Sequence, residues 1–130
     1  MKNFMDDQDF LLSTKTGEEL FHSFAEGMPI VDYHCHISPK EIWDDKRFEN
    51  ITEVWLGGDH YKWRLMRANG VDERFITGDA PAREKFQKWA ETLGRCVGNP
   101  VFEWSHLELK RFFGYEGVLN GNTAQEVWDL

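Results

Sequence analysis

The sequence predicts a protein of the α/β class that is mostly α-helical and contains one or two short strands. Amphipathic segments with helix-capping residues, separated by glycines, make up most of its 130 residues. One apolar run, residues 29–37, is rich in β-branched and aromatic residues and is too short for a helix. Six Trp and ten Phe supply enough apolar surface for a packed core.

The N-terminal segment, residues 1–28, is expected to be helical. Thr16 and Glu19 have the spacing of a capping box, in which each side chain bonds the other's backbone N–H. Gly27 suits the left-handed residue that follows a helix end. The expected apolar face consists of Leu20, Phe21 and Phe24.

Residues 29–37, PIVDYHCHI, are expected to form a buried strand. Ser38, Pro39 and Glu41 follow it directly and resemble an N-cap, a first-turn proline and a capping-box partner. The chain is therefore expected to run from a strand through a tight turn into a helix.

Beyond residue 38 the pattern predicts a series of further helices. Their expected N-terminal capping residues are Asn50, Asp59, Asp79, Asn99 and Asn122. Residues at helical spacing are expected to face the core: Phe86, Trp89, Ala90 and Leu93, and then Phe102, His106, Leu109 and Phe113. The last segment starts like a helix but has no stop signal before Leu130, so the chain is expected to be truncated there.

Composition excludes several classes of protein. The net charge of −8 is unsuited to binding nucleic acid or an anionic membrane, because no basic stripe displaces counterions. No apolar run approaches the roughly 20 residues that span a bilayer. The N-terminus is acidic and has no apolar h-region, so it is not expected to be a signal peptide. Cys35 and Cys96 are too few for a disulfide framework, which favours a reduced, cytoplasmic protein.

Two histidines lie one residue apart near the end of the expected strand. Asp32, His34 and His36 share one strand face, because side chains alternate. Two imidazoles at this spacing can bind one metal ion, and parallel α/β folds bind ligands at the carboxyl ends of their strands. Spacing alone leaves two interpretations open, a metal or substrate site and a pair of packed neutral histidines.

The segment WLGGDHYKWR, residues 55–64, is the second candidate for chemistry. His60 and Tyr61 fall in the first turn of the helix that follows the two glycines, and Arg64 recurs on the His60 face. A neutral His, a Tyr and an Arg on neighbouring positions suit proton transfer beside an oxyanion. The alternative is an exposed helix whose basic side chains are only solvated.

MPIVDYHCHISP (residues 28–39) and ITEVWLGGDHYKWRLMRANGVDE (residues 51–73) strongly resemble the N-terminal part of the bacterial uronate isomerases, also called glucuronate isomerases. The resemblance continues through EKFQKWAETL and NPVFEWSHLELKRFFG, and DHYKWR is its most specific string. This family belongs to the amidohydrolase superfamily. The resemblance implies the N-terminal portion of a distorted (β/α)8 TIM barrel, with residues 29–37 as the first strand and 38–130 as a truncated helical insertion.

The resemblance also implies an activity and its residues. The activity is reversible isomerisation of D-glucuronate to D-fructuronate and of D-galacturonate to D-tagaturonate, through a cis-enediol. His60 and Tyr61 would be catalytic and Arg64 would bind substrate. His34 and His36 would bind a divalent metal, with zinc the first choice. The family's other site residues lie beyond Leu130, so the 130 residues alone are expected to be inactive. The resemblance leaves open whether the enzyme is a homo-oligomer.

Two other functions remain candidates. A metal-dependent hydrolase of the same superfamily shares the paired histidines, and there the metal activates water. A small helical binding module would use its aromatic faces to dock a partner. His22 and His106 lie singly in amphipathic helices and are expected to be structural, and Cys35 points away from the histidine face.

Overall fold

The computed structural model describes residues 5, 6 and 8–130, and the chain divides into two compact units, Met1–Cys35 and His36–Leu130. Throughout the described residues the regular structure is helical, and no β-strand occurs among them. No helix in the same residues is long and apolar enough to cross a membrane.

Among the described residues of the first unit, a helix changes its hydrogen-bonding pattern along its length. Helix α1, Lys15–Leu20, continues as the π-helix η1, Phe21–Ala25. The expected cap at Thr16 is wrong, because the Thr14 hydroxyl accepts the Gly17 backbone N–H at 3.0 Å and starts the helix earlier.

His22 has a structural role in this unit, as expected. Its ring nitrogens lie 3.2 Å from carboxylate oxygens of Asp9 and Glu26. These hydrogen bonds raise the pKa of His22 above its ordinary value, and the bond to Asp9 has the larger effect. The ring thus links the helix to the preceding turn.

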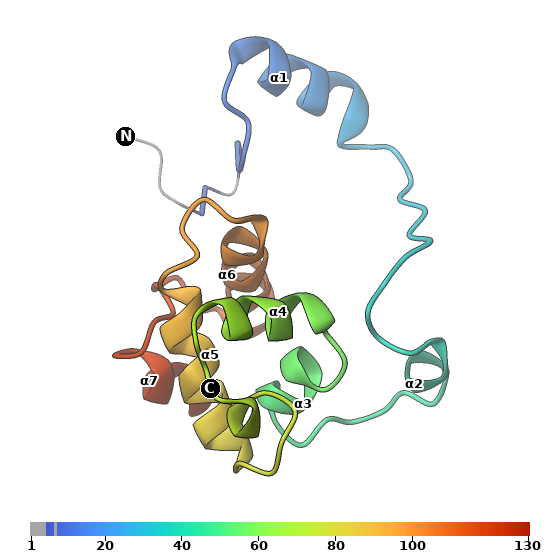
Figure 1. Cartoon of the computed structure of the whole chain (residues 1–130). Helices are drawn as coiled ribbons and strands as arrows, with labels where there is room; N and C mark the ends of the chain where they lie inside the picture. The colour runs from blue at the N-terminus through green and yellow to red at the C-terminus, as the bar shows by residue number, and fades with distance from the viewer. Residues whose placement is uncertain (1–4, 7) are drawn as a thin grey trace. The chain divides into compact units, whose positions relative to one another are not determined.

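In the second unit, helices α3, α4 and α7 pack around α5 (Figure 1). The elements of this unit are α2 (Pro39–Trp43), α3 (Ile51–Leu56), α4 (His60–Ala68), the 3-10 helix η2 (Glu73–Phe75), α5 (Ala82–Leu93), α6 (Pro100–Phe113) and α7 (Ala124–Trp128). Helix α5 lies in the core, and its Phe86, Trp89, Ala90 and Leu93 are fully buried as the helical spacing predicts.

Most of the predicted helix starts in this unit are confirmed. Asn50 accepts the Glu53 N–H, Asn99 accepts the Val101 N–H, and Asp59 caps α4. At α2 the Ser38 N–H donates to the Glu41 carboxylate at 3.3 Å, within the predicted capping box.

Two predicted caps are wrong. Asp79 is 95% exposed and pairs with Arg74 instead, and α5 begins after Pro81 without a side-chain cap. Asn122 does not cap α7, which begins after Thr123. Asp79 lies in a bend and Asn122 in a turn, and neither side chain accepts a backbone N–H at the start of the helix that follows.

The predicted strand at residues 29–37 does not form. The segment is irregular up to the bend at His36 and Ile37, and Ile30 and Tyr33 are 91% and 95% exposed. A strand is stable only when a neighbouring strand satisfies its backbone N–H and C=O groups. The described residues provide no such neighbour, so β-rich composition alone does not produce a strand.

Candidate active site

The structure brings three predicted site residues of the second unit into one aromatic cluster. The His36 ring stacks on both Tyr61 and His60, with centroids 5.1 and 5.4 Å apart. His60 and Tyr61 are themselves 4.6 Å apart. His60 and Tyr61 come from the first turn of α4, whereas His36 comes from the bend before α2. The cluster is open to solvent, because Tyr61 is 43% exposed.

Arg64 completes the cluster one helical turn along α4. Its guanidinium carbon lies 5.5 Å from the centre of the Tyr61 ring, within the range of a cation–π interaction. Arg67, which shares the same helix face by spacing, is instead held in an ion pair with Glu73. The structure therefore places Arg64, rather than Arg67, beside the phenol.

The backbone before α4 has little freedom to change. A side chain at Gly57 would place its Cβ 2.3 Å from the Glu53 carbonyl oxygen, so the chain can turn here only as glycine. Beyond the turn, the Trp63 indole N–H donates to the Leu56 carbonyl at 2.7 Å and ties α4 to the end of α3. The first turn of α4 is therefore fixed relative to the core.

Asp59 uses its two carboxylate oxygens differently. Oδ1 accepts the backbone N–H groups of Tyr61 and Lys62 and caps α4. Oδ2 lies 2.7 Å from the Lys62 Nζ and 3.5 Å from the His36 Nδ1. Burial by itself raises the pKa of Asp59, but the hydrogen bonds and charge of Lys62 outweigh burial and hold that pKa below its usual value.

The sequence analysis did not identify the residues that support the Asp59 cap, namely Lys62, Trp55 and Glu108. The Lys62 side chain is only 11% exposed, and its Nζ lies 6.0 Å from the Trp55 ring centre. The Trp55 indole N–H donates to Glu108 on α6 at 2.6 Å. Burial raises the pKa of Glu108, and the Lys62 charge acts in the opposite direction. The i,i+3 spacing of Asp59 and Lys62 was a visible signal, whereas the contact between Trp55 and Glu108 spans 53 residues and had none.

His34 lies in the first unit, which ends one residue later at Cys35. It is exposed, and its backbone N–H donates to the Asp32 carboxylate at 3.1 Å. Asp32 thus contacts the backbone of His34. His34 thus belongs to the first unit, whereas the cluster of His36, His60 and Tyr61 belongs to the second.

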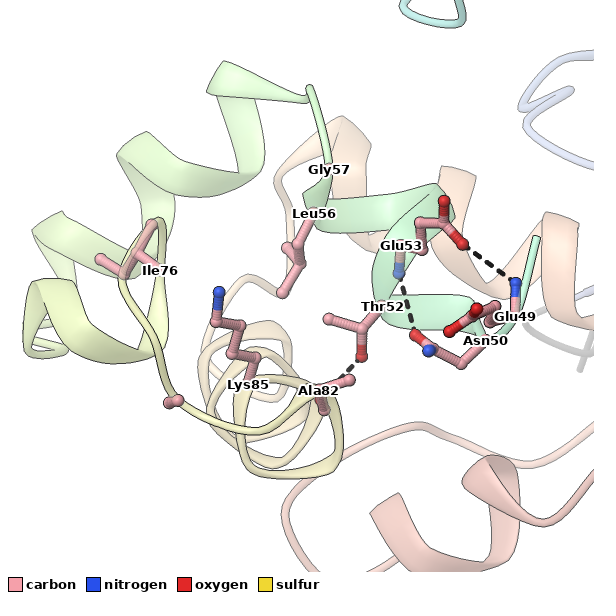
Figure 2. Close-up of a pocket in the computed structure, with 10 residues that line it drawn as sticks. Glu49, Asn50, Thr52, Glu53, Leu56, Gly57, Ile76, Ala82 and Lys85 are labelled. Atoms are coloured by element: carbon pink, nitrogen blue, oxygen red, sulfur yellow. Dashed lines mark hydrogen bonds between the residues drawn. The ribbon is translucent and has the colours of Figure 1, made fainter. Parts of the chain in front are cut away.

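A cavity of about 240 Å³ lies apart from the predicted site residues, beside α3 and the start of α5. Its polar groups bond one another: Thr52 donates to the Ala82 carbonyl, and the Glu49 N–H donates to Glu53 (Figure 2). The Lys85 ammonium donates to the Gly78 carbonyl at 2.6 Å. Because these groups are satisfied internally, the cavity presents no convergent set of polar groups to a ligand.

Comparison with known proteins adds a second line of evidence. The family model described as glucuronate isomerase matches residues 1–130. A uronate isomerase of Lachnospira eligens is 70% identical over the whole chain, and one of Endomicrobium trichonymphae is 65% identical. In both cases the chain spans 28% of the length of the relative.

A solved structure agrees with these matches. The crystal structure of uronate isomerase from Thermotoga maritima superimposes with a TM-score of 0.84 and 41% sequence identity. The superposition covers 94% of this chain and 27% of that one. The similarity thus extends to the three-dimensional arrangement of the helices.

Proposed function

The chain belongs to the glucuronate isomerase family, and we propose that it forms part of the active site of an enzyme that interconverts hexuronate aldoses and ketoses. The substrates would be D-glucuronate with D-fructuronate and D-galacturonate with D-tagaturonate. The observation that carries the proposal is the stacking of His36, His60 and Tyr61 beside Arg64. Since the chain spans 28% of its relatives' length, residues 1–130 alone are expected to be inactive.

The isomerisation moves a proton from C2 to C1 of the sugar through a cis-enediol. One base on one face of the substrate can remove and return this proton, and the proposal assigns that role to Tyr61, assisted by His60. Arg64 and the N-terminal end of α4 place positive charge beside the Tyr61 ring, where negative charge would develop during proton transfer.

Arg64 has a second use in the proposal. A guanidinium forms strong charge-assisted hydrogen bonds with carboxylates, and every hexuronate carries one. Arg64 is exposed and adjoins Tyr61. It therefore suits an anionic sugar that binds over the aromatic cluster.

His34 and His36 are the proposed metal ligands. Imidazole is a preferred zinc ligand, but a catalytic zinc site takes three protein ligands. No group of three or more His, Cys, Asp or Glu side chains suited to a metal occurs in the part of the chain that the structure describes. The donors thus fit zinc in type and supply part of a set. When bound, a divalent metal would polarise a substrate oxygen.

The proposal also accounts for the irregular segment at residues 29–37. In a (β/α)8 barrel of the amidohydrolase superfamily, this segment would be the first strand, paired with strands from elsewhere in the enzyme, and residues 38–130 would be a helical insertion. The exposed Ile30 and Val31 are apolar side chains that such pairing would cover. A cytoplasmic location suits the free thiols of Cys35 and Cys96.

The test is Tyr61→Phe in the complete enzyme. Proton NMR of glucuronate in D₂O should show that exchange of the C2 proton is lost, while circular dichroism shows an unchanged fold. Tyr33→Phe is the matched control, because it removes the same hydroxyl group from a tyrosine that is not part of the cluster of His36, His60 and Tyr61. Normal C2 exchange in the Tyr61 variant would remove this residue from the mechanism.

A further inference from the structure

One oxygen of Asp59 is not needed for its capping role. Oδ1 alone accepts both backbone N–H groups at the start of α4, at 2.9 and 3.2 Å. Oδ2 is left to face two side chains, the Lys62 ammonium at 2.7 Å and the His36 Nδ1 at 3.5 Å. With only 15% of the Asp59 side chain exposed, water competes little for this oxygen.

Lys62 holds that oxygen in place. The lysine is more buried than the aspartate and lies between Asp59 and the indole of Trp55. Glu108 fixes the indole from α6 and attracts the same ammonium. Contacts from α3, α4 and α6 therefore determine the orientation of the Asp59 carboxylate, which faces the His36 ring.

A carboxylate beside one ring nitrogen selects the tautomer of a neutral histidine. A proton on Nδ1 is attracted by the Asp59 oxygen, whereas a lone pair there would be repelled. The favoured tautomer carries the proton on Nδ1 and the lone pair on Nε2. A carboxylate that orients a ligating histidine in this way typically contributes 10- to 100-fold to metal affinity.

We propose that Asp59 is a positioning residue that fixes the tautomer and orientation of the His36 ring, with Lys62 holding the Asp59 carboxylate. The inference rests on the proposed function only for the use of Nε2 as a metal ligand. The tautomer is inferred from the 3.5 Å approach of Asp59 Oδ2 to the His36 Nδ1, which does not depend on the proposed function.

The decisive variant is Asp59→Asn. Asparagine caps helices as well as aspartate does, so α4 keeps its start while an amide NH₂ replaces the oxygen that faces Nδ1. Nitrogen-15 NMR of residues 1–130 at about pH 8.5, well above the pKa of an unperturbed histidine, reports which ring nitrogen carries the proton. The expected result is that the His36 proton moves from Nδ1 to Nε2.

Two further measurements separate positioning from folding. Asp72→Asn makes the same substitution at another helix N-cap, where Asp72 accepts the Arg74 N–H, and should leave the His36 spectrum unchanged. Unchanged backbone amide signals of Tyr61 in the Asp59 variant would show that the cap is intact.

Zinc titration of the metal-free complete enzyme is the second readout. The Asp59→Asn variant should bind Zn²⁺ with about 10- to 100-fold lower affinity, and Asp72→Asn should bind it normally. An unchanged His36 tautomer in Asp59→Asn would overturn the inference even if the wild-type enzyme isomerises glucuronate. A shifted tautomer with weakened zinc binding would support it even if glucuronate is not turned over, in which case only the proposed function fails.

Discussion

His106 provides the sharpest test of how the second unit is held together. It is 1% exposed on α6, and its Nε2 lies 2.9 Å from the Leu119 backbone nitrogen. Since a backbone N–H can only donate, Nε2 must accept, and the ring proton must be on Nδ1. Nδ1 then donates to the Phe102 carbonyl at 2.6 Å. One neutral tautomer thus connects α6 to the loop that contains Leu119.

Replacing His106 with Leu fills the site with an apolar side chain but removes the acceptor of the Leu119 N–H. An unsatisfied buried donor costs about 1–3 kcal/mol, and the lost bond to Phe102 adds about 0.5–1.5 kcal/mol. The free energy of unfolding should therefore fall by about 1.5–4.5 kcal/mol. Urea denaturation followed by tryptophan fluorescence measures it, because all six Trp lie in residues 36–130.

The pH dependence of stability should change as well. Burial lowers the pKa of His106, although the Phe102 carbonyl and Glu103 act in the opposite direction. Below about pH 6.5, the ordinary histidine pKa, the unfolded chain binds a proton that the folded ring resists. Stability is thus lost as the pH falls from 6.5 toward the folded pKa. His106→Leu should lack this loss.

Phe112→Leu is the control, because Phe112 is 78% exposed on the same helix. It should change the unfolding free energy by no more than about 0.5 kcal/mol. The reasoning is refuted if His106→Leu is as stable as the wild type, or if it keeps the same loss of stability between pH 6.5 and 5.

Three further predictions concern stability. Phe86→Ala should lower the unfolding free energy by about 3–5 kcal/mol, measured with urea, because this fully buried ring also contacts Trp128. Gly114→Ala should cost about 1–2 kcal/mol in the same assay, because φ is 67° there, and Gly114→Asn should cost less. Glu73, whose hydrogen bond with Arg67 lowers its pKa to about 2, stabilises the fold above pH 4.5. That contribution should disappear as the pH falls from 4.5 to 2, and Glu73→Gln should flatten the acid side of the thermal stability profile.

The features that the sequence predicted correctly are local ones. The caps at Asn50, Asp59 and Asn99 depend on a side chain and a backbone N–H two or three residues away, so spacing determines them. The caps predicted at Asp79 and Asn122 do not form, which shows the limit of predicting caps from spacing. Proximity to a helix start does not fix the turn that would direct the side chain toward it.

Non-local features were not predictable in the same way. The strand expected at residues 29–37 depends on partner strands, and the sequence of one strand carries no information about whether they are present. The hydrogen bond between Trp55 and Glu108 depends on how α3 and α6 pack. His106 was expected to be structural and is, but its bond to Leu119 also depends on a loop 13 residues away.

The candidate site combines both kinds of feature, and this determines where it is most sensitive. His60, Tyr61 and Arg64 are placed by one turn of α4, which is anchored to the core by the fully buried Met66, so their mutual geometry follows from the helix alone. His36 reaches them through tertiary contacts, which include its stacking on Tyr61 and the charged Asp59 carboxylate. A substitution that preserves α4 but removes that charge should therefore leave the pairing of His60 and Tyr61 intact while it disturbs His36 and the Lys62 ammonium.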